Sequence, residues 1–238
     1  MLDILKTVTP SSAQWEITFE GMRNSFNSWD RSDSIFCMRN ECFGCELKDD
    51  CGTDKPYFDI GPDDMRLMLN LAESGSSHSK FRRMLPVWVT VNAPLYWWKE
   101  FDTYKVGTVC NSCSTMHSIC NRAFTPEDFS HENLLTADDV KQWGEIVPAS
   151  TLDIIIAALN RYRLLYLETK DKKYWEQIIQ LLPSSYNQRR TVMLNYEVLS
   201  KIFAERKCHK LIEWHNFCGW IETLPYSELI TCGQKPAL

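Results

Sequence analysis

The fold class is decided by residues 78–117, which read HSKFRRMLPVWVTVNAPLYWWKEFDTYKVGTVCNSCSTMH. A run of apolar and β-branched residues from Met84 to Val91 is too short for a buried helix and is typical of a strand. Pro94 then suits the first turn of a helix, because its missing N–H would have no partner there. The segment that follows, LYWWKEFDTYK, places polar residues on one helical face and aromatic residues on another, and Gly107 ends it. A strand, a helix and a polar loop are therefore predicted in this order.

The loop expected after Gly107 is rich in small donors and acceptors. Residues 110–117 read CNSCSTMH, and such a composition lets a backbone and its hydroxyl groups approach a ligand closely. The same composition also suits an ordinary connector beside a protein core. Composition alone therefore leaves a ligand-binding loop and a structural connector open as alternatives.

The rest of the chain is mainly helical by its apolar spacing. The pattern predicts an α/β protein, in the α+β sense, with a mixed or antiparallel sheet flanked by helices and a helical C-terminal half. We expect a single domain over residues 1–238, with a cysteine-rich loop at 37–51 and a helical subdomain at 121–170. The predicted helices are Asp63–Ala72, Leu152–Leu167, Tyr174–Leu182, Asn187–Lys207 and Lys210–Thr223.

Composition and charge narrow the class of partner. The 238 residues, 44% of them hydrophobic, are enough to bury a full core. A net charge of -5 argues against a nucleic-acid groove, which normally carries a stripe of Lys and Arg. The N-terminus lacks a signal-peptide pattern, and no apolar run approaches the length of a membrane span. We therefore expect a cytoplasmic protein with reduced cysteines and without a nucleic-acid or membrane partner.

Four cysteines gather in the segment FCMRNECFGCELKDDC, at Cys37, Cys42, Cys45 and Cys51. Four thiolates can close a tetrahedral zinc site, and a cysteine-ligated iron–sulfur cluster is also chemically feasible. Only Cys42 and Cys45 have the tight two-residue spacing of a metal knuckle, so reduced loop thiols are the alternative.

A second set with ligand-like spacing comprises Cys110, Cys113, His117 and Cys120. It overlaps the polar loop described above. We therefore interpret it as loop chemistry rather than as a second metal site.

The spacing of residues 78–117 resembles the central motif region of the flavin-dependent thymidylate synthases. In that family a histidine before a strand, an Ala-Pro, an aromatic helix and an Arg-His-Arg-x-x-Ser-x-x-x-x-Ser-x-Arg-Tyr signature follow at fixed distances. His78 takes the histidine position, and Ala93-Pro94 matches the Ala-Pro. The departures are Thr103, Tyr104 and Lys105 for the Arg-His-Arg triplet, Thr108 and Cys113 for the serines, Thr115 for the late arginine, and Glu100 for an upstream glutamine.

A C-terminal block, LLPSSYNQRRTVMLNYEVLSKIFAERK, strengthens the resemblance. It is similar to the family's Leu-Pro followed by a long helix that bears an asparagine and, eleven residues later, an arginine; here these are Asn195 and Arg206. Eleven residues are close to three helical turns, so we expect both side chains on one helical face. Glu197 and Ile179 stand where the family has two further arginines.

The resemblance implies a fold, an activity and a set of ligands. The activity would be hydride and methyl transfer to a pyrimidine deoxynucleotide, dUMP or a related base, with FAD, NADPH and methylene-tetrahydrofolate, in a homotetramer. It places His78, Thr103, Tyr104, Lys105 and Asn195 near the flavin. It places Glu100, Cys113, Ser114 and Arg206 near the nucleotide, with Arg206 also taking part in catalysis.

The missing arginines leave two alternatives open. Each charged hydrogen bond to phosphate contributes about 1.5–3 kcal/mol, so several losses would weaken nucleotide binding by orders of magnitude. A flavoenzyme for another pyrimidine nucleotide is one alternative, since Asn111 stands at an acidic position of the family. The other is a non-catalytic nucleotide-binding or interaction protein, similar to phage and prophage relatives, that retains the fold without flavin chemistry.

Overall fold

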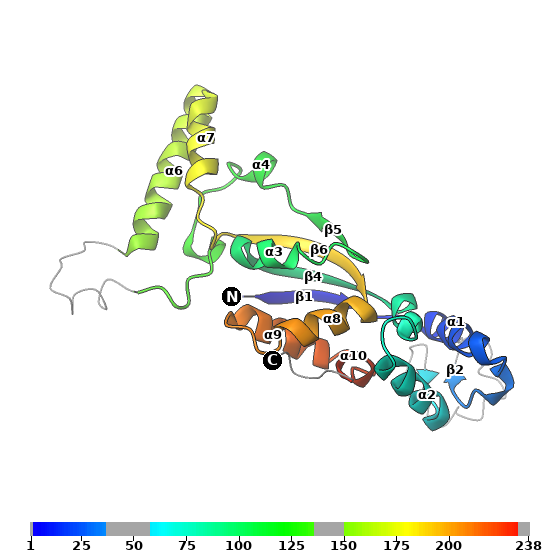
Figure 1. Ribbon diagram of the computed structural model, residues 1–238. Helices are drawn as coiled ribbons and strands as arrows, with labels where there is room; N and C mark the ends of the chain where they lie inside the picture. Colours follow the sequence, from blue (N-terminus) through cyan, green and yellow to red (C-terminus); the bar gives the residue numbers. More distant parts are fainter. Residues whose placement is uncertain (1, 37–57, 136–149, 233–238) are drawn as a thin grey trace, which may run out of the picture. The chain divides into compact units, whose positions relative to one another are not determined.

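The computed structural model describes residues 2–36, 58–135 and 150–232 (Figure 1). The chain divides into two compact units. Unit 1 contains Met1–Leu5, Thr90–Thr103 and Asn111–Thr191, and unit 2 contains Lys6–Val89, Tyr104–Cys110 and Val192–Leu238. The domain prediction for 1–238 and the subdomain prediction for 121–170 stay predictions.

A four-stranded sheet has the order β1-β4-β6-β5. It is antiparallel and flanked by helices, which confirms the predicted fold class. A separate two-stranded antiparallel sheet pairs β2 (Ile35–Phe36) with β3 (Phe58–Asp59), in a register that sets Phe36 opposite Phe58. The strands of the larger sheet are β1 (Asp3–Val8), β4 (Pro86–Pro94), β6 (Asn187–Asn195) and β5 (Val109–Ser112).

Unit 1 contains a pair of helices that pack side by side, α6 (Thr151–Thr169) and α7 (Lys172–Leu181) (Figure 1). Ser150 begins α6 with a capping box, and Lys170 ends it in the left-handed conformation, with φ of 56°. Asp171 then caps α7, so two residues suffice to turn the chain. The apolar faces bury a cluster of Ile119, Phe124, Phe129, Leu152, Leu159 and Ile178. The shorter helices of this unit are α3 (Leu95–Phe101), α4 (Thr115–Ser118) and the 3₁₀ turn η4 (Pro126–Asp128).

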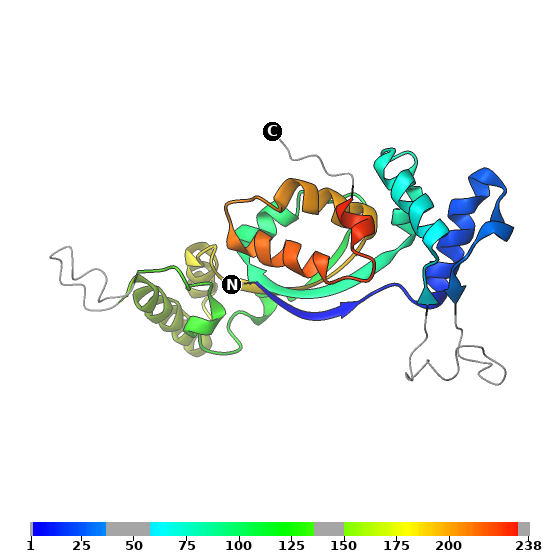
Figure 2. The ribbon, with the colours of Figure 1, turned by 90° about the horizontal axis from the view of Figure 1, so that it is seen from below.

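Unit 2 has an aromatic core. Trp15 is fully buried, with its ring centroid 5.7 Å from that of Tyr196 and 5.5 Å from that of Tyr226. Figure 2 shows α8 (Tyr196–Arg206) and α9 (Ile212–Glu222) side by side, with α10 (Glu228–Thr231) against α8. The other helices of this unit are α1 (Ser12–Arg23), η1 (Asn24–Phe26), η2 (Trp29–Arg31), α2 (Pro62–Glu73) and η3 (Ser79–Met84).

The helix predicted over Asn187–Lys207 is wrong in its first half. Residues 187–195 form strand β6, and the helix begins only at Tyr196. The burial of Gln188, Val192 and Leu194, at even positions, shows the period of two that a strand imposes. The side chain of Asn195 accepts a hydrogen bond from the backbone N–H of Val198, so Asn195 is the N-cap of α8 and not part of a helical face.

The loop predicted for residues 110–117 is more ordered than expected. Val109–Ser112 form β5, and Thr115–Ser118 form the short helix α4. Backbone hydrogen bonds explain the difference, because Cys113 N donates to the Arg189 carbonyl oxygen at 3.0 Å. The strand and helix predicted on either side of Pro94 are confirmed as β4 and α3, with Pro94 at the N-cap of α3. The helices predicted over Asp63–Ala72, Leu152–Leu167, Tyr174–Leu182 and Lys210–Thr223 are also confirmed.

Cys37, Cys42, Cys45 and Cys51 lie outside the described residues, so the metal prediction there stays a prediction.

Within 2–36, 58–135 and 150–232, no helix is long and apolar enough to cross a membrane.

Candidate functional site

Tyr104 and Arg206, which come from the two motif blocks, meet in unit 2. The Nε of Arg206 donates to the Tyr104 hydroxyl oxygen at 2.9 Å, and that hydroxyl donates to Oε2 of Glu205 at 2.8 Å. The Arg206 guanidinium lies 4.8 Å from the ring centroid of buried Trp214, in cation–π geometry. Arg206, at the end of α8, is therefore held in one orientation by a phenol and an indole.

Gly107 and Asn195 meet at the other end of α8. Gly107 has φ of +80°, and a Cβ added there would lie 3.0 Å from Cγ2 of Val198 and 3.4 Å from Nδ2 of Asn195. Glycine is required both by the positive φ and by this close approach. Asn195 uses Oδ1 to cap α8, and its Nδ2 group occupies the space beside Gly107 that a Cβ would enter.

These contacts show how the segment Tyr104–Cys110 lies relative to α8. Tyr104 contacts the last turn of the helix, and Gly107 contacts its first turn. The Thr108 hydroxyl donates to the Tyr104 carbonyl oxygen and closes the turn between them. The segment therefore runs along α8, and it joins the two motif blocks within one unit.

Burial controls the protonation of Tyr104. Only 6% of the residue is exposed, and this desolvation raises its pKa to about 12, while the Arg206 guanidinium opposes the rise and Glu205 adds to it. The phenol therefore stays neutral over the physiological range. It acts as a hydrogen-bond acceptor for Arg206 and as a donor to Glu205.

Unit 1 contains a second polar network, built on Arg190 of β6. Its Nη1 donates to Oδ1 of Asp102 at 2.7 Å, and its guanidinium lies 4.4 Å from the ring centroid of Trp98. Only 14% of the Arg190 side chain is exposed. Arg190 of β6 therefore links to Asp102 at the end of α3 through an ion pair whose guanidinium is largely shielded from solvent.

Gln188 extends this network to the loop that carries the predicted nucleotide residues. Its Oε1 accepts from Nε of Arg190 at 2.8 Å, and its Nε2 donates to the Cys113 carbonyl oxygen at 3.2 Å and to the Thr115 hydroxyl at 3.0 Å. The backbone of this loop is held from two sides, because Cys113 N also bonds to β6. The side chains of Cys113 and Ser114 are exposed, so the arrangement holds the loop and leaves both groups accessible.

The structure divides the predicted site residues between the two units. Unit 2 holds His78, Tyr104, Lys105, Asn195 and Arg206, and unit 1 holds Glu100, Thr103, Cys113 and Ser114. Within unit 2, His78 and Lys105 are exposed, whereas Tyr104 is buried. In unit 1 the Thr103 hydroxyl donates to the Glu100 carbonyl oxygen at 2.7 Å, so it closes the end of α3.

Gln188 and Arg190 were not among the predicted site residues, because the apolar pattern assigned both to a helix over Asn187–Lys207. Burial alternates along β6 in the structure, but the polar side chains at 188–190 hide this period of two in the sequence. Within the described ranges, no group of three His, Cys, Asp or Glu side chains has the geometry to hold a metal ion.

Comparison with solved structures identifies a common fold. The structure of thymidylate synthase X from Helicobacter pylori with FAD and dUMP has a TM-score of 0.61 and 15% identity, over 98% of this chain and 99% of that one. A second structure of the flavin-dependent enzyme from Helicobacter pylori, complexed with FAD and dUMP, has a TM-score of 0.58 and 14% identity, over 97% of each chain. No protein-family model matches the chain. No curated protein matches it. The chain therefore has a flavin-dependent thymidylate synthase-like fold.

Proposed function

We propose that this chain binds FAD and a pyrimidine deoxynucleotide and catalyses a reaction of the thymidylate synthase type. The observation that carries the proposal is the fold similarity, which extends over almost the full length of both chains and involves structures with FAD and dUMP. Tyr104 and Gly107 both contact α8, which adds support because these contacts bring the central motif block and the C-terminal block together. dUMP or a nucleotide with a related base is the proposed substrate.

We propose that residues of unit 2 hold the flavin dinucleotide. Gly107 lets Val198 and Asn195 pack closely against its backbone. The Asn195 Nδ2 group can donate to a ring carbonyl or nitrogen of the flavin. Lys105 is exposed, with no ion pair to any described residue, so its ammonium group is available for a diphosphate. We propose that His78 and Thr103 complete the flavin neighbourhood, as the resemblance implies.

Arg206 is the proposed contact for the nucleotide. Its Nε is directed to Tyr104 and its face to Trp214, which leaves its orientation defined before any ligand arrives. A guanidinium in a defined orientation can bind a phosphate or a pyrimidine carbonyl through two parallel N–H groups. Glu100, Cys113 and Ser114 are proposed as further nucleotide contacts, with the loop backbone held by Gln188.

The proposed reaction consumes methylene-tetrahydrofolate and NADPH. When bound, FAD would supply the hydride that completes the methyl group, with NADPH as its reductant, and the C5 hydrogen of the pyrimidine would leave as a proton. The chain's own residues would bind and orient the substrate, and Arg206 is the proposed catalytic residue. No side-chain nucleophile is required.

Three further features belong to the same proposal. We propose that the protein is a homotetramer, that it is located in the cytoplasm, and that it is a divergent relative of phage or prophage type. A zinc ion at Cys37, Cys42, Cys45 and Cys51 is proposed on spacing alone.

A non-catalytic relative is the second candidate function. It is favoured by the state of Tyr104, which is buried at a position where the family has a histidine. Such a protein would bind a nucleotide through Arg206 without a flavin.

Flavin binding separates the two candidates. Purified full-length protein is mixed with FAD, and the shift of the flavin absorbance bands is followed during titration. Binding that is weakened about tenfold by Lys105→Ala and unaffected by the matched change Lys210→Ala supports the proposed flavin site. Release of tritium from dUMP labelled at C5, dependent on NADPH and methylene-tetrahydrofolate, then tests the reaction itself. Protein that binds dUMP but neither takes up FAD nor releases tritium would identify the non-catalytic relative.

A further inference from the structure

Unit 2 contains a small pocket whose walls come from α1, η1, η2 and α2, away from the residues assigned above. Its volume is about 200 Å³. Three arginines, Arg23, Arg31 and Arg66, line it together with Asp63, Ser28, Asn70 and an apolar wall of Phe26 and Leu67.

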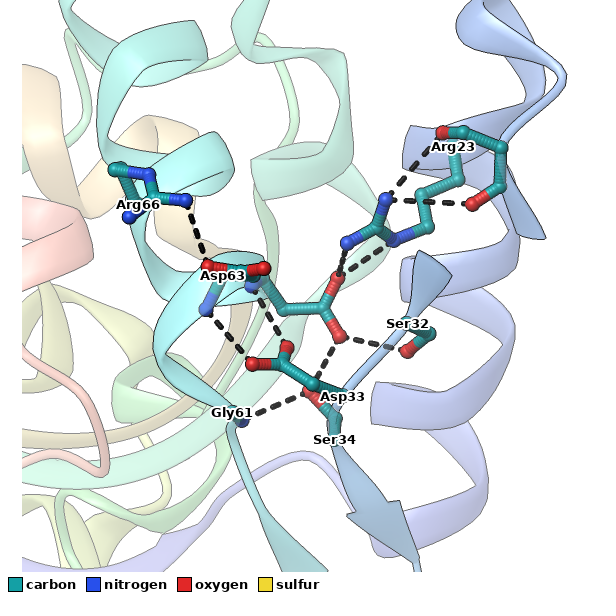
Figure 3. Close-up of polar contacts among 9 residues, drawn as sticks. Arg23, Ser32, Asp33, Ser34, Gly61, Asp63 and Arg66 are labelled. Atoms are coloured by element: carbon teal, nitrogen blue, oxygen red, sulfur yellow. Dashed lines mark hydrogen bonds and ion pairs between the residues drawn. The ribbon is translucent and has the colours of Figure 1, made fainter. Parts of the chain in front are cut away.

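Arg23 forms a rigid base for this pocket. The residue is 4% exposed, and its Nε and Nη2 donate to Oδ1 of Asp64 at 2.7 and 2.6 Å (Figure 3). Its Nη1 lies 3.3 Å from both the carbonyl oxygen and the hydroxyl of Ser28. A guanidinium held in this way loses little conformational entropy when it receives a ligand.

The Asp64 carboxylate behind Arg23 is already fully engaged. Asp64 is fully buried, and its Oδ2 accepts hydrogen bonds from the hydroxyls of Ser32 and Ser34 at 2.6 Å each (Figure 3). Asp33 accepts from the backbone N–H groups of Asp63 and Asp64 at 2.9 and 3.0 Å. Asp64 therefore pairs directly with Arg23, and the Asp33 charge, which the two backbone N–H groups hold, also interacts with Arg23.

The other two arginines of the pocket are exposed to solvent. Arg66 pairs with Asp63 at 2.6 Å, but both side chains are more than half exposed, so water and salt weaken the pair. The Arg31 guanidinium has no ion-pair partner among the described residues. Arg31 and the weakly paired Arg66 therefore bring charged N–H donors to the pocket, beside the buried Arg23–Asp64 pair.

We propose that this pocket binds a small phosphate group, as orthophosphate or as the phosphate of a small monoester. Phosphate offers several oxygens to a fork of N–H donors, which is the geometry that arginine recognises best. The volume is below the range typical of pockets for drug-sized ligands, so the pocket suits a group of the size of phosphate better than a whole nucleotide. The site uses residues other than Arg206 and is independent of the proposed flavin chemistry.

The test is a calorimetric titration of the full-length protein with potassium phosphate. The control is the same titration with potassium chloride at equal ionic strength. Binding specific to phosphate is expected, and Arg31→Gln should weaken it about tenfold. Arg83→Gln is the matched control, because Arg83 is also exposed in unit 2 but does not line the pocket. Arg66→Gln gives a second variant in case Arg31→Gln alters the fold, which circular dichroism would detect.

Two further arms make the outcome decisive. Phenyl phosphate that binds more tightly than orthophosphate would identify an organic monoester as the ligand, because Phe26 and Leu67 offer an apolar wall. The loss of phosphate affinity caused by Arg31→Gln should be equally large in an Arg206→Gln background, which separates this pocket from the proposed nucleotide site. Equal affinities in Arg31→Gln, Arg66→Gln and Arg83→Gln, or no difference between phosphate and chloride, would overturn the proposal.

Discussion

Replacing Tyr104 by phenylalanine removes one hydroxyl and keeps the ring, whose centroid lies 6.2 Å from that of Trp214. The hydroxyl accepts from Arg206 and donates to Glu205, and a hydrogen bond to a charged group contributes about 1.5–3 kcal/mol. Glu205 is exposed and regains water in the variant, so it adds little to the cost. We therefore expect Tyr104→Phe to lower the free energy of unfolding by about 2 kcal/mol near neutral pH.

The pH dependence gives this prediction a specific signature. Burial raises the pKa of Tyr104 to about 12, whereas an unfolded tyrosine titrates near 10. A raised pKa of this kind stabilises the fold fully below about pH 10, and the contribution is lost as the pH rises toward 12. Near pH 11 the loss is about 1.4 kcal/mol, because this pH lies about one unit above the unfolded pKa and about one unit below the folded pKa, and one unit corresponds to about 1.4 kcal/mol.

Urea unfolding of the wild type and the variant, at about pH 8 and about pH 11, tests this reasoning. The difference in unfolding free energy should fall from about 2 to below about 1 kcal/mol, since other tyrosines cancel between the two proteins. Tyr162→Phe is the matched control, because Tyr162 is half-buried in unit 1 and no hydrogen bond of its hydroxyl contributes to the network described above. A difference that is the same at both pH values would refute the assigned cause, and a difference below about 0.5 kcal/mol near pH 8 would refute the role of the hydroxyl.

Three other changes have defined outcomes. Asp64→Asn leaves the Arg23 guanidinium buried without its counter-charge and should lower the free energy of unfolding in urea by about 3–5 kcal/mol. The control Asp63→Asn, at a side chain that is 57% exposed, should lower it by less than about 1 kcal/mol. Equal losses in the two variants would contradict the buried pair. Arg190→Lys keeps the charge but loses the planar fork that orients Gln188, the residue that holds the loop backbone. Amide hydrogen exchange at residues 113–118 should therefore accelerate about tenfold. Unchanged exchange would mean that the loop does not depend on Arg190. Elemental analysis of fresh protein should find stoichiometric zinc that disappears on Cys42→Ser, and a substoichiometric amount would argue against the metal prediction.

The local elements could be predicted because their signals lie within a few turns of chain. The β-branched run before Pro94 predicts β4, and apolar spacing of 3.6 residues predicts the helices that became α2, α6, α7 and α9. The spacing of the two motif blocks also indicated the fold that comparison with solved structures supports. These features depend on backbone geometry and on capping, which neighbouring residues decide.

The strand at Asn187–Asn195 could not be recognised with the same means. Its residues NQRRTVMLN precede a strong helix, and charged side chains at Arg189 and Arg190 obscure the alternation. Pairing within the sheet of order β1-β4-β6-β5 supplies the hydrogen bonds that make it a strand. Tertiary context overrides local propensity at such a position.

By itself, the sequence determined the types of most elements, the α/β class and the two segments that would carry a site. Tertiary structure alone decided which side chains meet. Arg23 and Asp64 are 41 residues apart and Tyr104 and Arg206 are 102 apart, and no periodic pattern links either pair. The physical reason is that a buried charge requires a partner but does not specify where in the chain that partner lies, so only the packed fold selects it.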